Sequence, residues 1–203
     1  MDSQPASIAS ATGGIDIHHH FLPPFFVDAL AQSGHPAAAQ VEGVAWSPEK
    51  SLAMMGESGI ETSIVSLSLP GASFRGAADP AALARQGNEY AARMVADYPG
   101  RFGAFASLPM LDTQAALAEV AYALDTLKLD GVMLLTNVRG RYPGDQAFDP
   151  LLAELNRRKA IVFLHANHAP GPGVNHFVEF PHDVSRALAS LTESGGIERY
   201  HRI

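Results

Sequence analysis

The feature that most constrains the fold of this 203-residue chain is a regular alternation of short apolar segments with longer helical segments. The apolar segments are rich in Val, Ile and Leu, which favour strands, and they span 15–20, 62–69, 102–108, 131–135 and 161–165. Capping residues, prolines and glycines delimit the segments between them, and we expect helices over 24–32, 47–59, 79–98, 112–127, 149–159 and 182–194. Continuous apolar strands separated by helices predict a parallel sheet covered by helices.

Two architectures fit this pattern, a doubly wound open sheet and a (β/α)8 barrel. The first strand is not followed by G-x-G-x-x-G, which disfavours a dinucleotide-binding open sheet. Histidines at the carboxyl ends of strands favour the barrel, whose active sites lie on that face. A complete barrel usually takes about 250 residues, and only five strands are found here. We therefore expect an α/β fold of the (β/α)8 TIM-barrel type, incomplete at about five βα units, either truncated or completed by another chain.

Composition narrows the class of protein. Residues 1–13 are small and polar and are expected to form a disordered leader, with residues 14–203 forming the N-terminal part of the barrel. The net charge is -7 and the basic residues do not cluster, so nucleic acid is not expected as a partner. The apolar runs are too short to span a bilayer, and a cytoplasmic protein without a membrane partner is expected. There is no cysteine, so any metal must be held by His, Asp or Glu.

The first strand carries a histidine pair. Side chains alternate along a strand, so His18 and His20 project to one side and His19 to the other. Two imidazoles at the end of a strand predict a metal site; the alternative is a chance run or a leftover affinity tag. Asp16 shares their predicted face and is either an acceptor that orients a ligand imidazole or a structural acid. His19 is expected to pack or hydrogen-bond against a helix.

Several runs together resemble one family, the amidohydrolase-2 branch of the amidohydrolase superfamily. They are IDIHHHFLPP, WSPEKSLAMMGESGIETSIVSLSLPGA, RFGAFASLPMLD, LDGVMLLTN and NRRKAIVFLHANH. The branch is typified by aminocarboxymuconate semialdehyde decarboxylase, and the chain looks most similar to its 6-methylsalicylate and γ-resorcylate decarboxylases. The resemblance covers about residues 14–203.

The resemblance implies a metal centre and a reaction. The family's paired ligands fall on His18 and His20, and its third ligand falls on His165, which is also implied to be catalytic. The implied metal is Zn²⁺ or another divalent ion such as Mn²⁺. The implied reaction is non-oxidative decarboxylation of a small aromatic or muconate-type carboxylic acid, in which an acid protonates the ring carbon and carbon dioxide leaves. A later catalytic His and a metal-binding Asp of the family have no counterpart before Ile203, and a homodimer is expected for the full-length form.

Arginines near the expected active face are candidates to bind the oxygens of the substrate. Arg139 and Arg141 follow the fourth strand, and Arg75 follows the second. Each has a simpler alternative as a solvated loop residue.

The region after the fifth strand supplies further candidates. His182, at the start of the last predicted helix, is a candidate catalytic residue or an ordinary cap-region residue. Phe180, with Phe177 and Trp46, is a candidate aromatic wall against the substrate or simple packing. The Gly/Pro-rich loop 170–173 is a candidate lid.

Two other functions stay open from the sequence. The same site could serve a metal-dependent hydrolase of a lactone or amide, because the superfamily contains both chemistries. The chain could also be a truncated, non-catalytic fragment that needs a partner chain to fold.

Overall fold

The computed structural model describes residues 13–169 and 175–203, and in it five parallel strands form one sheet in the order β1-β2-β3-β4-β5. The predicted leader lies outside the described residues except for Gly13, and the predicted lid, 170–173, lies outside them entirely. The strands are β1 (Gly14–Phe21), β2 (Ile60–Leu67), β3 (Phe102–Ala106), β4 (Gly131–Leu135) and β5 (Ile161–His165). All five predicted strands are present. β2 begins and ends two residues earlier than expected because Gly59 ends the preceding helix and Ile60 immediately pairs with Gly14.

Helices occupy every connection between the strands. They are α1 (Pro24–Ser33), α2 (Ala38–Val41), α3 (Pro48–Ser58), α4 (Pro80–Asp97), α5 (Thr113–Ala121), α6 (Asp149–Arg158), α7 (His176–Glu193) and α8 (Gly196–Arg199), with a π turn η1 (Tyr122–Thr126) and a 3-10 turn η2 (Gln146–Phe148). The predicted caps act as expected: Ser47, Asp79 and Asp112 accept hydrogen bonds from backbone N–H groups in the first turns of α3, α4 and α5.

The predicted start of the last helix was wrong by six residues. We expected this helix to span residues 182–194 and to end before Gly195. α7 instead begins at His176, capped by the Asn175 side chain, and continues through Pro181. Pro181 lacks the N–H that would bond to the carbonyl one turn earlier, and the capped first turn and the packing of the later turns maintain the helix.

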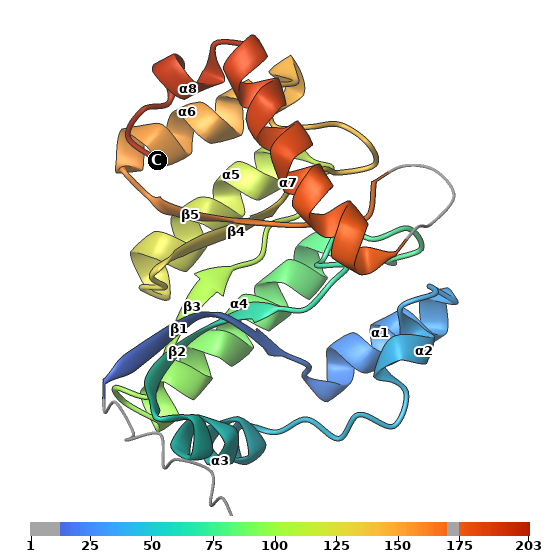
Figure 1. Ribbon diagram of the computed structural model, residues 1–203, viewed down its shortest axis with the longest axis vertical. Coiled ribbons are helices and arrows are strands. Elements are labelled where there is room, and N and C mark those ends of the chain that lie inside the picture. The colour runs from blue at the N-terminus through green and yellow to red at the C-terminus, as the bar shows by residue number, and fades with distance from the viewer. Residues whose placement is uncertain (1–12, 170–174) are drawn as a thin grey trace, which may run out of the picture.

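The curvature of the sheet separates two faces. Alternate strand residues such as Ala104, Val132 and Leu134 belong to one large core cluster with the helices. Phe105 and Met133 are equally buried but lie outside that cluster, because they face the opposite side of the sheet. Figure 1 shows the resulting shape, a curled half-barrel with most of the helices on its convex side.

β1 and β5 are the two edges of this half-barrel, and each pairs with a single strand among the described residues. Apolar side chains on these edges are exposed, with Ile15 at 67%, Ile17 at 56% and Ile161 at 59%. The expected incomplete barrel with two unpaired edges is thus confirmed. Within residues 13–169 and 175–203, every helix is too short or too polar to traverse a lipid bilayer.

Candidate metal centre

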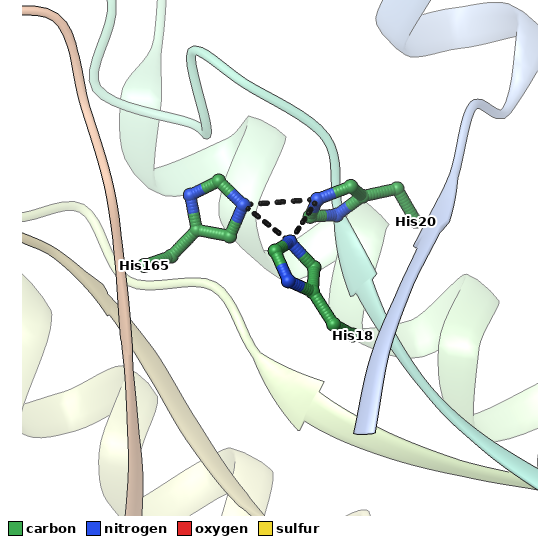
Figure 2. Close-up of side chains that lie close together, drawn as sticks. All are labelled: His18, His20 and His165. Atoms are coloured by element: carbon green, nitrogen blue, oxygen red, sulfur yellow. Dashed lines mark hydrogen bonds between the residues drawn. The ribbon is translucent and has the colours of Figure 1, made fainter. Parts of the chain in front are cut away.

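His18, His20 and His165 meet on the concave face of the sheet. The Nε2 atoms of His18 and His20 are 3.1 Å apart, and the Nε2 atom of His165 lies 2.9 Å from His18 and 3.0 Å from His20. Figure 2 shows the three rings with these nitrogens turned toward a common point. Because β1 and β5 are opposite edges of the sheet, only its curl brings these side chains together.

The remaining ring nitrogens have partners that fix the orientation of two imidazoles. The Nδ1 atom of His20 lies 3.1 Å from the Ser66 hydroxyl and 3.3 Å from the Ser66 carbonyl oxygen. The Nδ1 atom of His165 lies 2.6 Å from the carbonyl oxygen of Ala166. A proton on each Nδ1 satisfies these carbonyls and leaves the Nε2 lone pairs facing the common point.

Burial keeps two of the rings uncharged. Burial, together with the neighbouring His165 and His18, lowers the pKa of His20 to about 4. Burial also lowers the pKa of His165, against the opposing effect of the Ala166 carbonyl. Both rings are therefore neutral at pH 7, which is the form of imidazole that binds metals.

The cluster fits a divalent cation. Two nitrogen ligands bound to one tetrahedral zinc ion at 2.0–2.1 Å are separated by roughly 3.3 Å, and the three edges measured here, 2.9–3.1 Å, are only slightly shorter. Lone pairs that face one another at this range repel, and a cation between them removes the repulsion. Three histidines leave further coordination positions open for water or an oxygen ligand.

The Asp16 carboxylate contacts the ring of His19 and not the imidazoles of the histidine cluster. The register of β1 against β2 is irregular between Asp16 and His19, so the simple alternation of faces fails here. The Asp16 carboxylate lies 3.2 Å from Nδ1 of His19 and accepts the backbone N–H of His18 at 2.9 Å. Of the two alternatives for Asp16, the structural acid is therefore the one observed. The prediction for His19 is confirmed, because its Nε2 contacts Ser51 of α3 at 2.9 Å.

An aromatic floor adjoins the cluster, and the sequence analysis did not identify it. The ring of Phe163 packs edge-on against His18, with centroids 5.2 Å apart, and stacks on Phe105 at 5.5 Å. The available signal was the alternation in β5, which places Phe163 on the same face as His165.

A pocket of about 200 Å³ lies beside the cluster, at the carboxyl ends of β2, β3, β4 and β5. Met133 and Leu135 form part of its wall, and Leu135 is the direct partner of His165 in the β4–β5 ladder. Arg139 and Arg75 also line it. Arg141 lies elsewhere, beside a separate apolar cavity with Leu134 and Phe148.

The other predicted site residues lie around or away from this region. Phe180 is half-buried, and its ring packs 5.2 Å from His168, which lines the pocket. His182 is exposed on α7, with Nδ1 2.6 Å from the Val178 carbonyl oxygen, and the structure does not bring it to the histidine cluster. Its catalytic role and the substrate role of Phe180 stay predictions.

The predicted aromatic wall does not form from the remaining two rings. Phe177 is 90% exposed. Trp46 donates from Nε1 to Ser51 at 3.1 Å and packs against Phe21 and Tyr90 in the core.

A buried carboxylate that the sequence analysis missed organises the loops around the pocket. Asp183 is fully buried on α7 and accepts hydrogen bonds from the Tyr142 hydroxyl at 2.6 Å, from Asn137 Nδ2 at 2.8 Å and from the Thr136 hydroxyl. The Thr136 oxygen in turn accepts the N–H of Asn167 at 2.8 Å. Burial and the Asp183 carboxylate raise the pKa of Tyr142 to about 12. Asp183 thus ties α7 to the segments that follow β4 and β5.

Comparison with known proteins places the chain among catalytic relatives. A family model described as Amidohydrolase matches residues 15–193. The decarboxylase yanB of Aspergillus niger is 41% identical, with 91% of this chain and 55% of the relative covered. The 6-methylsalicylic acid decarboxylase acuB of Aspergillus aculeatus is 38% identical, with 93% and 59% covered. The chain therefore spans between half and two thirds of the length of these curated relatives.

Solved structures share the fold. An amidohydrolase II structure superposes with a TM-score of 0.83 at 30% identity, covering 94% of this chain and 65% of the other. A dihydroxybenzoic acid decarboxylase from a Polaromonas species, with bound manganese and the inhibitor 2-nitroresorcinol, has a TM-score of 0.76 at 22% identity, covering 94% and 63%.

Proposed function

The chain belongs to the amidohydrolase family, and on that premise we propose that it acts as a metal-dependent carboxy-lyase on a small aromatic carboxylic acid. The single observation that carries this proposal is the convergence of three imidazole nitrogens within 3.1 Å of one another on the concave face. The names of the relatives that are at least 38% identical, which are decarboxylases, support the reaction type.

The chain's own residues would hold the cation through His18, His20 and His165. A set of three imidazole nitrogens favours zinc, whereas manganese prefers carboxylate and water ligands. We therefore propose Zn²⁺ as the first choice and Mn²⁺, the ion of the dihydroxybenzoic acid decarboxylase, as the second. The bound ion would supply a Lewis acid that draws electron density from the oxygens of the substrate.

The surrounding side chains would orient the substrate ring and exclude water. The ring of Phe163, which packs against His18 and stacks on Phe105, offers a flat apolar surface for an aromatic acid. In the reaction, a proton adds to the ring carbon that bears the carboxylate. The C–C bond to the carboxylate then breaks, its electron pair returns to the ring, and neutral carbon dioxide leaves.

The test measures carbon dioxide release. The chain, loaded with Zn²⁺ or Mn²⁺, is incubated with 6-methylsalicylate and with hydroxybenzoates, and both carbon dioxide and the decarboxylated phenol are quantified. We expect metal-dependent release that is lost in a variant with all three histidines changed to alanine. Stoichiometric metal binding without decarboxylation of any such acid would refute the proposal, and incorporation of labelled solvent oxygen into a product would instead indicate a hydrolase.

A folding control precedes this assay. A sharp, cooperative thermal transition of the monomer, followed by circular dichroism, would exclude the alternative that the chain needs a partner to fold.

A further inference from the structure

We propose that Arg139 binds the carboxylate of the aromatic acid in the pocket beside the histidine cluster, held there by the hairpin Val138–Arg141. This inference rests on the proposed function for the position of the ligand and adds the residue that selects an acid over a neutral ring. Four observations support it.

The pocket has the charge that an organic anion requires. Its described lining includes Arg75 and Arg139 and no acidic side chain, although the whole chain carries a net charge of -7. Neither arginine forms an ion pair within residues 13–169 and 175–203. Their guanidinium groups are therefore available to a ligand, and a guanidinium matches the geometry of a carboxylate.

The pocket also has the size and lining that a single aromatic ring requires. Its volume is about 200 Å³, and a cavity of about 150 Å³ is enough to bind benzene. Leu108, Met133 and Leu135 supply apolar walls. A ring with a carboxylate and one or two small substituents fits this combination.

The hairpin presents Arg139 in a conformation that its side chain does not favour. Val138 and Arg141 exchange two backbone hydrogen bonds of 3.0 and 3.1 Å, and the two residues between them, Arg139 and Gly140, have φ of 52° and 80°. Positive φ at both central residues defines a tight turn in which Asn-Gly is usual. Arginine at the first of these positions is strained, which the structure offsets with the hydrogen bond from Gly140 N–H to the buried Asn137 side chain.

The same turn separates two of the three arginines that the sequence could not rank. Arg139 lines the pocket, whereas Arg141 lies beside a different cavity. The pocket shares its wall with the cluster, because Leu135 pairs with His165 and Met133 pairs with Phe163. The pocket lining contains none of the three histidines, so an acid bound by Arg139 would lie beside the cluster, against Met133 and Leu135.

The experiment compares two probes by isothermal titration calorimetry on the zinc-loaded chain: salicylate and its neutral analogue salicylamide. We expect Arg139→Gln to weaken salicylate binding about 10–100-fold, as loss of a charge-assisted pair does, with salicylamide binding unchanged. Arg141→Gln is the matched control and should change neither affinity. Arg139→Gly removes the backbone strain together with the charge, so it should match or exceed the wild type in stability and still lose salicylate binding.

Failure of this inference and failure of the proposed function give different results. Unchanged salicylate affinity in Arg139→Gln would overturn the inference, even where carbon dioxide release and metal content remain intact. An Arg139-dependent affinity without any carbon dioxide release would uphold the anion pocket and refute the carboxy-lyase. An equal loss of salicylate affinity in Arg141→Gln would also overturn the inference, because it would indicate a general effect of surface charge.

Discussion

Removal of the Asp183 carboxylate is expected to destabilise the whole fold. Asp183→Ala leaves three hydrogen-bond donors without their acceptor: the Thr136 hydroxyl, the Asn137 amide and the Tyr142 hydroxyl. Thr136 is fully buried and Asn137 is 3% exposed, so water cannot replace the lost carboxylate oxygen at either group. An unsatisfied buried donor costs about 1–3 kcal/mol, and we expect a total loss of about 3–5 kcal/mol.

The free energy of unfolding in urea, followed by circular dichroism, measures this loss. A domain of this size has a total stability of about 5–15 kcal/mol, so the expected change is a large fraction of the whole. Asp183→Asn keeps one acceptor oxygen and should lose about half as much, which provides a measurable variant if the alanine variant does not fold. Arg186→Gln is the control, because Arg186 is exposed and lies 3.6 Å from Asp183, and its loss should cost less than about 1 kcal/mol. A stability of Asp183→Ala within about 1 kcal/mol of the wild type, at an unchanged urea dependence, would refute the reasoning.

Three further predictions test the metal centre, the sheet and the half-buried Tyr142. Changing His18 or His20 to alanine should lower metal affinity by more than the roughly 10–100-fold lost when a residue that only hydrogen-bonds to a metal ligand is changed. The metal content after dialysis measures this loss. Full occupancy in either variant would exclude that residue from the site. Gly131→Ala should destabilise the chain by roughly 1–3 kcal/mol in the same denaturation assay, because a Cβ at this position would clash with a backbone oxygen of β5. Gly56→Ala is the control and should be neutral or stabilising, because nothing lies within 4 Å of a Cβ at that position. Tyr142 should ionise near pH 12, above the usual value of 10, so the free energy of unfolding should fall between those pH values as the unfolded chain loses this proton first. An absorbance titration compared with Tyr142→Phe measures this ionisation, and a transition near pH 10 would contradict the hydrogen bond to Asp183.

Local sequence patterns were enough for the architecture. Each strand was predicted from a run of apolar residues, and the start of each long helix except α7 from a cap or a proline, because these signals act within a few residues of the chain. The one large error was the start of α7, which begins six residues before the predicted position with a first turn capped by Asn175, and which continues through Pro181.

In the candidate site, too, some features followed from local sequence patterns and others did not. The alternation of side chains along β1 was sufficient to place His18 and His20 together and to send His19 toward α3. It failed for Asp16 because an irregular register, which depends on the neighbouring strand, interrupts the alternation.

The sequence by itself determined the strands, their order of alternation with helices and the histidine pair on β1, since these depend on neighbours in the chain. The family resemblance had implied that His165 joins that pair, and the tertiary structure shows the curl of the sheet that brings it there. Only the tertiary structure decided that Arg139 and not Arg141 lines the pocket, and that Asp183 is buried while the adjacent His182 is exposed. The physical reason is that these outcomes depend on the curl of the sheet, on one tight turn with positive φ and on the rotation of α7 about its axis. Each of these is set by packing among residues far apart in the chain.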